Sequence, residues 1–279
     1  MHKYRTLRHE LDRLASATWD LVDQSHHQRI ALREDALTSV NLIHLKRGHY
    51  PGFWIETFTP VTERANGADF EWWIGSHGEG WLGLRVQAKR EYHRNYPDVV
   101  YTPTKGGPTQ CDSLIQTVRA ESQGRALYPF YCFYNGWDGG SGWPSDVDWS
   151  IGCSVPANCE TVPDVRIFGC GLAPAEAVRP FLAPYTRRRW HKLLPLQFPW
   201  SWLFWNPWHG PMGSMAEIQA GLHLMMARVA GDNSAVQQPD LYRELPEYVI
   251  AAQEGIELTQ PAPAKWFLVT DIGQASDRG

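Results

Sequence analysis

Two short segments of this sequence carry side chains that could bind a metal ion and a phosphate group. Asp69 and Glu71 are two residues apart in the segment DFEWWI, and Gln87 and Lys89 are two residues apart in LRVQAK. Alternate residues of a β-strand project from the same face, so each pair points in one direction if its segment is a strand. An acid, an amide oxygen and an ammonium group would then lie within reach of one small ion or one phosphate.

The residues between these segments predict that the two strands form a hairpin. Residues 75–80 (GSHGEG) are rich in turn formers. A register that pairs Gly75 with Trp81 also sets two further cross-strand pairs, which are Asp69 with Gln87 and Glu71 with Arg85. Directly opposed side chains have Cβ atoms about 5 Å apart. Glu71 therefore has two interpretations, as a site residue or as the structural ion-pair partner of Arg85.

These groups suit phosphodiester hydrolysis. That reaction needs a hard divalent cation to stabilise charge on the attacking and leaving oxygens, and Mg²⁺ prefers oxygen ligands. Asp69 is the first expected ligand, and the Gln87 amide oxygen and the Ala88 carbonyl are further donors. Lys89 supplies a positive charge that could steer the attacking water or stabilise the phosphate. Because Gln87 stands where a second acid would bind more strongly, we expect weak affinity for Mg²⁺ or Mn²⁺.

Two further polar residues lie near the starts of predicted helices. Glu34 could supply or orient another metal ligand, but it is also typical of the negative charge that the helix dipole favours in a first turn. Gln110 could face the site, or it could be an ordinary polar residue at a helix N-terminus. Both interpretations stay open for each residue.

The surrounding sequence predicts alternating helices and strands. We expect helices over 4–24, 29–46 and 109–122, strands over 53–59 and 126–134 on either side of the hairpin, and then a strand over 149–155 and a helix over 173–182. The order helix, three strands, helix, strand is typical of an α/β sheet with helices packed on its faces.

After Pro184 the composition changes. A basic run at 187–192 precedes a segment rich in Trp and Pro at 195–211. Its tryptophans, at positions 200, 202, 205 and 208, could cover an edge of the sheet or could stack on bases beside the arginines. Helices over 214–230 and 247–253 and a strand over 264–272 should follow. We therefore divide the chain into an N-terminal helix (1–28), a core (29–184) and a C-terminal extension packed on the core (185–279).

Composition limits the classes of function. A net charge of −4 excludes a protein that is polycationic as a whole, so any contact with nucleic acid must use local positive charge. Five cysteines without a CxxC pair argue against a disulfide framework, and together with the lack of a signal-peptide pattern they predict a cytoplasmic protein with buried thiols. The most apolar window, 193–208, is interrupted by prolines and is too short to span a membrane.

The ordered string GADFEWW…QAK…TQCDSLI…PFYCFYN resembles a bacterial family of unassigned activity with the pattern GADWEWW…QAKR. More broadly it resembles the restriction-endonuclease-like PD-(D/E)xK superfamily, in the variant with QxK in place of the second acid. The resemblance covers roughly residues 33–134. It implies a mixed sheet flanked by helices and a Mg²⁺- or Mn²⁺-dependent endonuclease acting on DNA, in host defence or genome maintenance. The residues that it implicates are Asp69, Gln87, Lys89 and Glu34, with Gln110 as an additional candidate.

Two other classes of function remain open. The first is a nucleic-acid-binding or regulatory protein that keeps the fold with an inactive site, which the glutamine at position 87 and the acidic net charge both allow. The second is a sugar-binding or sugar-cleaving protein, suggested by the many tryptophans and by Asp69 with Glu71. The choice between DNA and RNA, and the pairing of two chains as a homodimer that cuts both strands, are not determined by the sequence.

Overall fold

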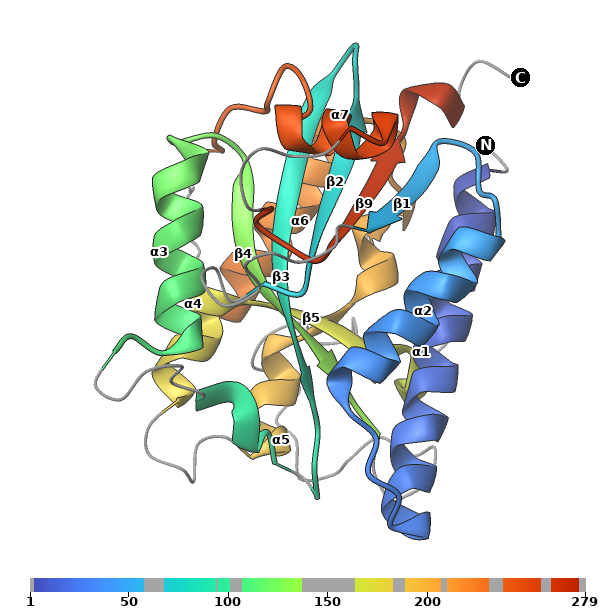
Figure 1. Ribbon diagram of the computed structural model, residues 1–279, viewed down its shortest axis with the longest axis vertical. Helices are drawn as coiled ribbons and strands as arrows, with labels where there is room; N and C mark the ends of the chain where they lie inside the picture. Colours follow the sequence, from blue (N-terminus) through green and yellow to red (C-terminus); the bar gives the residue numbers. More distant parts are fainter. Residues whose placement is uncertain are drawn as a thin grey trace.

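The centre of the protein is a seven-stranded mixed sheet (Figure 1). The structure is a computed structural model, and it describes residues 3–57, 68–93, 95–100, 107–136, 164–182, 189–206, 210–230, 238–256 and 262–275. The strand order is β1-β9-β2-β3-β4-β5-β6. The pairs β2–β9 and β3–β4 are parallel, and the other neighbouring strands are antiparallel. The strands are β1 (Phe53–Thr57), β2 (Phe70–Ser76), β3 (Gly80–Arg90), β4 (Leu127–Tyr134), β5 (Cys170–Pro174), β6 (Phe198–Pro199) and β9 (Trp266–Asp271), and β7 (Trp205–Asn206) pairs separately with β8 (Gly210–Pro211).

The β2–β3 hairpin has the register that the sequence predicts. Gly75 lies opposite Trp81, and Glu71 lies opposite Arg85. Position 75 has no room for a side chain, because a Cβ there would lie 2.2 Å from the carbonyl oxygen of Gly80. Every residue of β2, and every residue of β3 except the last, is buried. That burial is expected for strands that are covered by helices on both faces.

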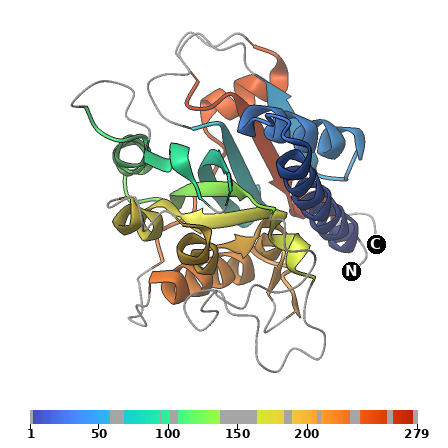
Figure 2. The same cartoon turned by 90° about the horizontal axis from the view of Figure 1, so that it is seen from below.

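Helices cover both faces of the sheet (Figure 2). α1, α2 and α6 pack on one face, where they share an apolar core with Trp72, Leu84 and Val86. α3 and α7 pack on the other face, against Trp73 and the other side of the central strands. The α-helices are α1 (Lys3–Gln28), α2 (Glu34–Arg47), α3 (Gln110–Ser122), α4 (Ala175–Val178), α5 (Trp190–Leu193), α6 (Met215–Ala230) and α7 (Glu247–Glu254). Short 3-10 helices span Pro97–Val100, Val165–Gly169, Arg179–Phe181, Leu194–Leu196, Trp200–Leu203 and Gly273–Ala275.

The C-terminal part of the chain contributes strands to the central sheet. β9 lies between β1 and β2, and β6 forms an edge beside β5. The segment 185–279, expected to pack on the core as an extension, is thus partly built into the core. Two local expectations also differ from the structure. Residues 170–174 form a strand, and the predicted helix over 173–182 is reduced to two short helical turns, while the predicted strand at 149–155 lies outside the described residues.

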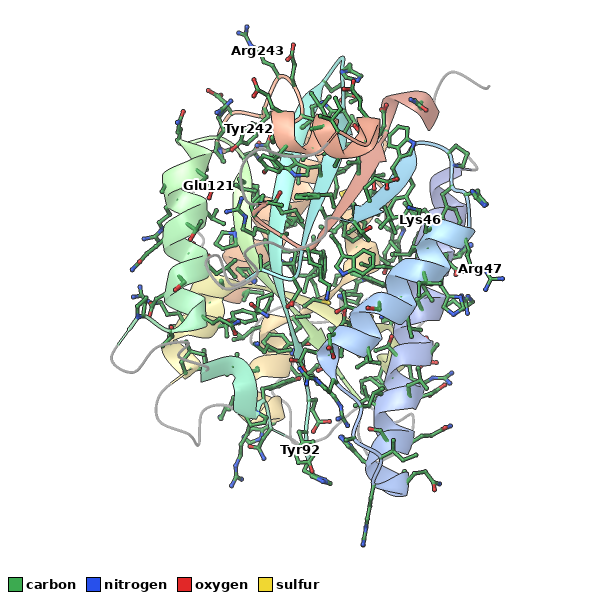
Figure 3. The ribbon with its side chains drawn as sticks, viewed as in Figure 1. Lys46, Arg47, Tyr92, Glu121, Tyr242 and Arg243 are labelled. Atoms are coloured by element: carbon green, nitrogen blue, oxygen red, sulfur yellow. The ribbon has the colours of Figure 1, made fainter. Side chains whose placement is uncertain are left out.

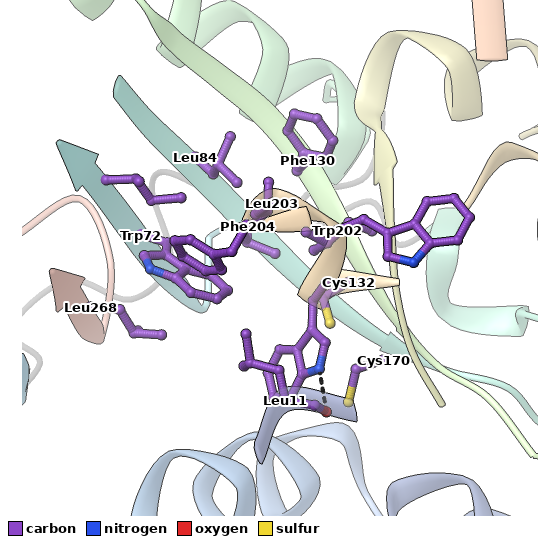
Figure 4. Close-up of a cluster of buried hydrophobic side chains, with 14 of the residues drawn as sticks. Leu11, Trp72, Leu84, Phe130, Cys132, Cys170, Trp202, Leu203, Phe204 and Leu268 are labelled. Carbon is purple, nitrogen blue, oxygen red and sulfur yellow. Dashed lines mark hydrogen bonds between the residues drawn. The ribbon is translucent and has the colours of Figure 1, made fainter. Parts of the chain in front are cut away.

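The tryptophan-rich segment packs inside the protein where the structure describes it. Trp200 and Trp202 are 2% and 1% exposed, and Trp200 Nε1 donates a hydrogen bond of 2.8 Å to the carbonyl oxygen of Leu11. Figure 4 shows Trp202 among buried side chains from the sheet and from α1. The packing interpretation is therefore confirmed for these two residues. Trp205 is partly buried, with the Arg8 guanidinium 4.0 Å from its ring centre, and Trp208 lies outside the described residues.

The cysteines and the helix lengths bear on two expectations from composition. Cys111, Cys132 and Cys170 are buried free thiols, as predicted, and burial raises the pKa of Cys111 to about 11. Cys153 and Cys159 lie outside the described residues. In the described ranges, each helix falls short of the length and apolar character that a membrane crossing needs.

Candidate functional site

Asp69 lies directly before β2 and faces the neighbouring strand. Its Oδ2 accepts hydrogen bonds from Gln87 Nε2 at 2.5 Å and from the Ala88 backbone N–H at 2.7 Å. Its own backbone N–H donates to the Val86 carbonyl at 2.8 Å. The hairpin therefore brings the carboxylate of Asp69 against Gln87, as the register predicts.

Gln87 is almost fully buried and has one unsatisfied atom. The side chain is 4% exposed, and its Nε2 also lies 3.3 Å from the Ala88 carbonyl oxygen. Its Oε1 is buried with no hydrogen-bond partner among the described residues. Leaving a buried acceptor unpaired costs about 1–3 kcal/mol. A half-turn of the amide would exchange its two ends and place Oε1 beside Asp69 Oδ2 and the Ala88 carbonyl.

Lys89 lies on the same face of β3 as Gln87 and is held by α3. Its side chain is 5% exposed, and Nζ donates a hydrogen bond of 2.9 Å to Gln110 Oε1. Gln110 is the first residue of α3, and Thr109 caps the helix by accepting from the Asp112 N–H. A carboxylate, a buried amide and a buried ammonium group thus lie on one face at one end of the hairpin.

Glu71 lies in a buried ion pair. Its Oε1 accepts from Arg85 Nε at 2.6 Å, and its Oε2 accepts from Trp73 Nε1 at 3.1 Å and from the Tyr248 hydroxyl at 2.9 Å. Arg85 Nη2 also donates to Glu121 Oε2 at 2.5 Å. Burial lowers the pKa of Arg85, but the two carboxylates outweigh this effect and hold its pKa above the usual value. Of the two interpretations of Glu71, these contacts favour the structural ion pair.

Glu34, the first residue of α2, lines a cavity of about 600 Å³ together with Arg90. The lining residues of this cavity do not include Asp69, Gln87 or Lys89. Arg90 follows Lys89 on β3, so its side chain leaves the strand on the opposite face, where it bonds to α1 and to the segment before α2. Hydrogen bonds join Asp69 to Gln87 and Lys89 to Gln110, whereas Glu34 lines the cavity beside Arg90.

Sequence reasoning missed Glu121 and Tyr248, which complete the polar surroundings of Arg85. The helical spacing between Gln110 and Glu121 could have indicated Glu121. Gln110 and Glu121 are eleven residues apart on α3, which is about three helical turns, so they share one face of the helix. That face contacts Lys89 at one end and Arg85 at the other. Tyr248 arrives from a distant helix, and no local pattern marks it.

Among Asp69, Gln87, Lys89 and Gln110, Asp69 supplies the one carboxylate. In the described parts of the chain, no group of three or more His, Cys, Asp or Glu side chains is arranged to hold a metal ion. Within this set, a cation bound at Asp69 would have amide and carbonyl oxygens as its other protein ligands. This donor set is compatible with Mg²⁺ or Mn²⁺, which accept neutral oxygen ligands and retain water.

Comparison with known proteins identifies one family. A search of curated proteins gave no match to this chain. A family model matches residues 7–271, which is nearly the whole sequence and includes every residue of the site. The chain therefore belongs to the family described as "Family of unknown function (DUF6615)".

Proposed function

We propose that this protein is a nuclease that hydrolyses phosphodiester bonds in DNA with Mg²⁺ or Mn²⁺. The observation that carries the proposal is the buried and unpaired Oε1 of Gln87, which lies on the amide that contacts Asp69. Lys89 lies on the same face of the sheet and provides the positive charge. These groups are the ones that metal-assisted phosphodiester hydrolysis needs.

The arrangement of the elements supports a restriction-endonuclease-like core. α2, β1, the β2–β3 hairpin, α3 and β4 follow one another in the order expected from the sequence, and β3 is joined to the parallel strand β4 through α3. β9 is inserted between β1 and β2. The candidate residues come from the residue before β2, the end of β3 and the start of α3. The antiparallel pairing of β2 with β3 brings the first two together, and the Lys89–Gln110 hydrogen bond joins α3 to them.

The residues around Asp69 fit a divalent cation. Its carboxylate, Gln87 Oε1 and the Ala88 carbonyl would hold the ion. A bound ion would supply stabilisation of negative charge on the phosphate oxygens. Lys89 would hold a further phosphate oxygen, with Gln110 orienting its ammonium group. Burial of Lys89 strengthens its interaction with a phosphate because water screens it poorly there.

One observation favours a second function, binding of nucleic acid without cleavage. Asp69 Oδ2 already accepts two hydrogen bonds, and one donor is the Gln87 amide that stands where a second acid would be. A carboxylate that already accepts these hydrogen bonds gains less from binding a metal ion. The orphaned Oε1 is the reason to prefer the catalytic function.

A cleavage assay distinguishes the two functions. Purified protein is incubated with supercoiled plasmid and with linear single-stranded DNA, in Mg²⁺, in Mn²⁺ or in excess EDTA. We expect cleavage with either metal, none with EDTA, and none with the Asp69→Ala variant. Cleavage that persists in EDTA or in Asp69→Ala would contradict the proposed site, and binding of DNA without cleavage in all metals would support the second function.

The Gln87→Glu variant tests the metal ligands. A second carboxylate beside Asp69 should increase Mn²⁺ affinity by about tenfold, because ligand charge tunes the affinity of oxygen sites. Without metal, the two adjacent carboxylates repel each other, so the variant should melt at a lower temperature and recover when Mn²⁺ is added. Titration calorimetry and thermal unfolding measure both effects.

Gln116→Glu provides the matched control, since Gln116 is exposed on α3. It adds the same charge away from the site and should leave Mn²⁺ affinity unchanged. Equal affinity in wild type and Gln87→Glu would remove Gln87 from the proposed set of ligands.

A further inference from the structure

Three arginines line the cavity that Glu34 also lines. It lies where the end of α1, the start of α2 and the residues after β3 meet, and Arg29, Arg33 and Arg90 all line it. Among the described residues, Glu34 is the one acidic side chain in its lining, and the Arg33 guanidinium lies 3.4 Å from the exposed carboxylate of Asp35. Tyr92, labelled in Figure 3 at the lower end of the ribbon, also lines the cavity. Three guanidinium groups around one cavity are suited to bind an anion.

Arg90 is held in place with one hydrogen-bond donor unused. Its Nη1 donates to the Leu32 carbonyl and its Nη2 donates to Ser25 Oγ, both at 2.5 Å. Its Nε is buried and has no hydrogen-bond partner among the described residues. Buried donors in folded proteins are nearly always paired, so the group lacks an acceptor that a bound anion could supply.

Arg29 adopts a backbone conformation that favours glycine. Its φ is 53°, and it directly follows α1, where the Ile30 N–H bonds to the Ser25 carbonyl. This is the position after a helix at which glycine is preferred, because a left-handed residue there carries a steric penalty if it has a side chain. His93 has a φ of 46° and lines the same cavity. Two strained residues that both line one cavity are typical of a functional site.

Aromatic rings adjoin the arginines. His26 and His93 stack with ring centres 5.1 Å apart, and Tyr92 meets both rings edge-on. The Tyr92 side chain is 52% exposed. The Glu91 carboxylate lies 3.5 Å from His26 Nε2, an ion-pair distance when that histidine is protonated. An exposed aromatic ring next to guanidinium groups can stack on a nucleobase while the arginines hold its phosphate.

We propose that this cavity binds the phosphate monoester of a nucleotide, either at the end of a nucleic-acid strand or on a free mononucleotide. The choice of a nucleotide, as opposed to another phosphate ester, rests on the proposed function as well as on the aromatic rings. The cavity uses none of Asp69, Gln87 or Lys89, so phosphate binding is separable from cleavage.

The test measures binding in EDTA, where the proposed nuclease cannot act. Fluorescent single-stranded oligonucleotides with a 5′-phosphate, a 3′-phosphate or only hydroxyl ends are titrated with the full-length protein, and a nucleoside monophosphate and its nucleoside serve as competitors. We expect one phosphorylated ligand to bind about tenfold more tightly than its hydroxyl counterpart, as charge-assisted hydrogen bonds imply. The preferred oligonucleotide or mononucleotide identifies the source of the phosphate.

The variant Arg29→Gly/Arg33→Gln should lose this preference without losing thermal stability. Glycine removes a cation and also relieves the left-handed strain at position 29. Arg47→Gln is the matched control, because Arg47 is exposed at the other end of α2, away from the cavity (Figure 3). It should keep the tenfold preference. Equal binding of all phosphorylated and hydroxyl ligands by the wild type would overturn the proposal, and so would an equal loss in Arg47→Gln. Either result leaves the metal-dependent cleavage assay unaffected.

Discussion

A Lys89→Ala variant is expected to cleave DNA about 10²–10³-fold more slowly than the wild type, because it loses one preorganised group that stabilises charge in the transition state. The Lys89 ammonium is suited to that role. It is 5% exposed, and a 2.9 Å hydrogen bond to Gln110 Oε1 fixes its position. Single-turnover cleavage with Mn²⁺ measures the rate, and binding measured in EDTA shows whether affinity for DNA changes. A loss of rate with binding within a few-fold of wild type would indicate a contribution to the transition state.

Two further variants separate this role from a general effect of charge. Lys46→Ala removes an exposed lysine that pairs with Glu56 at 3.4 Å on the molecular surface, so its cleavage rate should match the wild type. Gln110→Ala keeps the ammonium group and removes its hydrogen-bond partner, so it should reduce the rate by about tenfold. Lys89→Ala protein that is folded and cleaves at the wild-type rate would show that Lys89 is not part of the site.

An Arg85→Met variant is expected to be about 3–5 kcal/mol less stable to unfolding than the wild type, because it leaves the Glu71 carboxylate buried without its partner. Arg85 and Glu71 are both 0% exposed, and their closest atoms are 2.6 Å apart. Urea denaturation measures the change through the midpoint of unfolding, provided that the slope of the transition is unchanged.

The paired replacement tests the reason for this loss. Arg85→Met/Glu71→Leu removes both buried charges, so it should recover most of the lost stability, although Trp73 and Tyr248 lose an acceptor. Arg119→Met is the matched control on α3, since Arg119 is exposed and lies 3.9 Å from Glu176. It should change the free energy of unfolding by less than about 0.5 kcal/mol. A loss in Arg85→Met no larger than in Arg119→Met would show that the buried ion pair contributes little.

The buried ion pair adjoins the candidate site, so a change in the ion pair can affect cleavage. Glu71 and Arg85 each lie two residues from a site residue, on the same face of their strands as Asp69 and Gln87. Because Arg85 also bonds to Glu121 of α3, the pair connects the hairpin to the helix that carries Gln110. Stability variants at Arg85 should therefore also be assayed for cleavage, since a shift of α3 would move the partner of Lys89.

The local elements and the pairing of the site residues could be predicted from the sequence. The turn residues at 75–80 and the alternation on either side of them allow one register that buries both strands, and that register pairs Asp69 with Gln87. The spacing of Gln87 and Lys89 then puts the lysine on the same face. These features depend on contacts between residues that are close in the chain, which is why a pattern of residue types was enough.

Only the tertiary structure decided the surroundings of these residues. Glu34 lies near the start of a predicted helix, and in the structure it lines the arginine-lined cavity beside Arg90, a neighbour that the sequence does not indicate. β9 enters the sheet between β1 and β2, nearly two hundred residues after its partner β2 begins, and Tyr248 reaches Glu71 from α7. Such contacts depend on how separate elements pack in three dimensions. The composition and periodicity of each element restrict which faces are buried, but they do not determine which distant face will cover them.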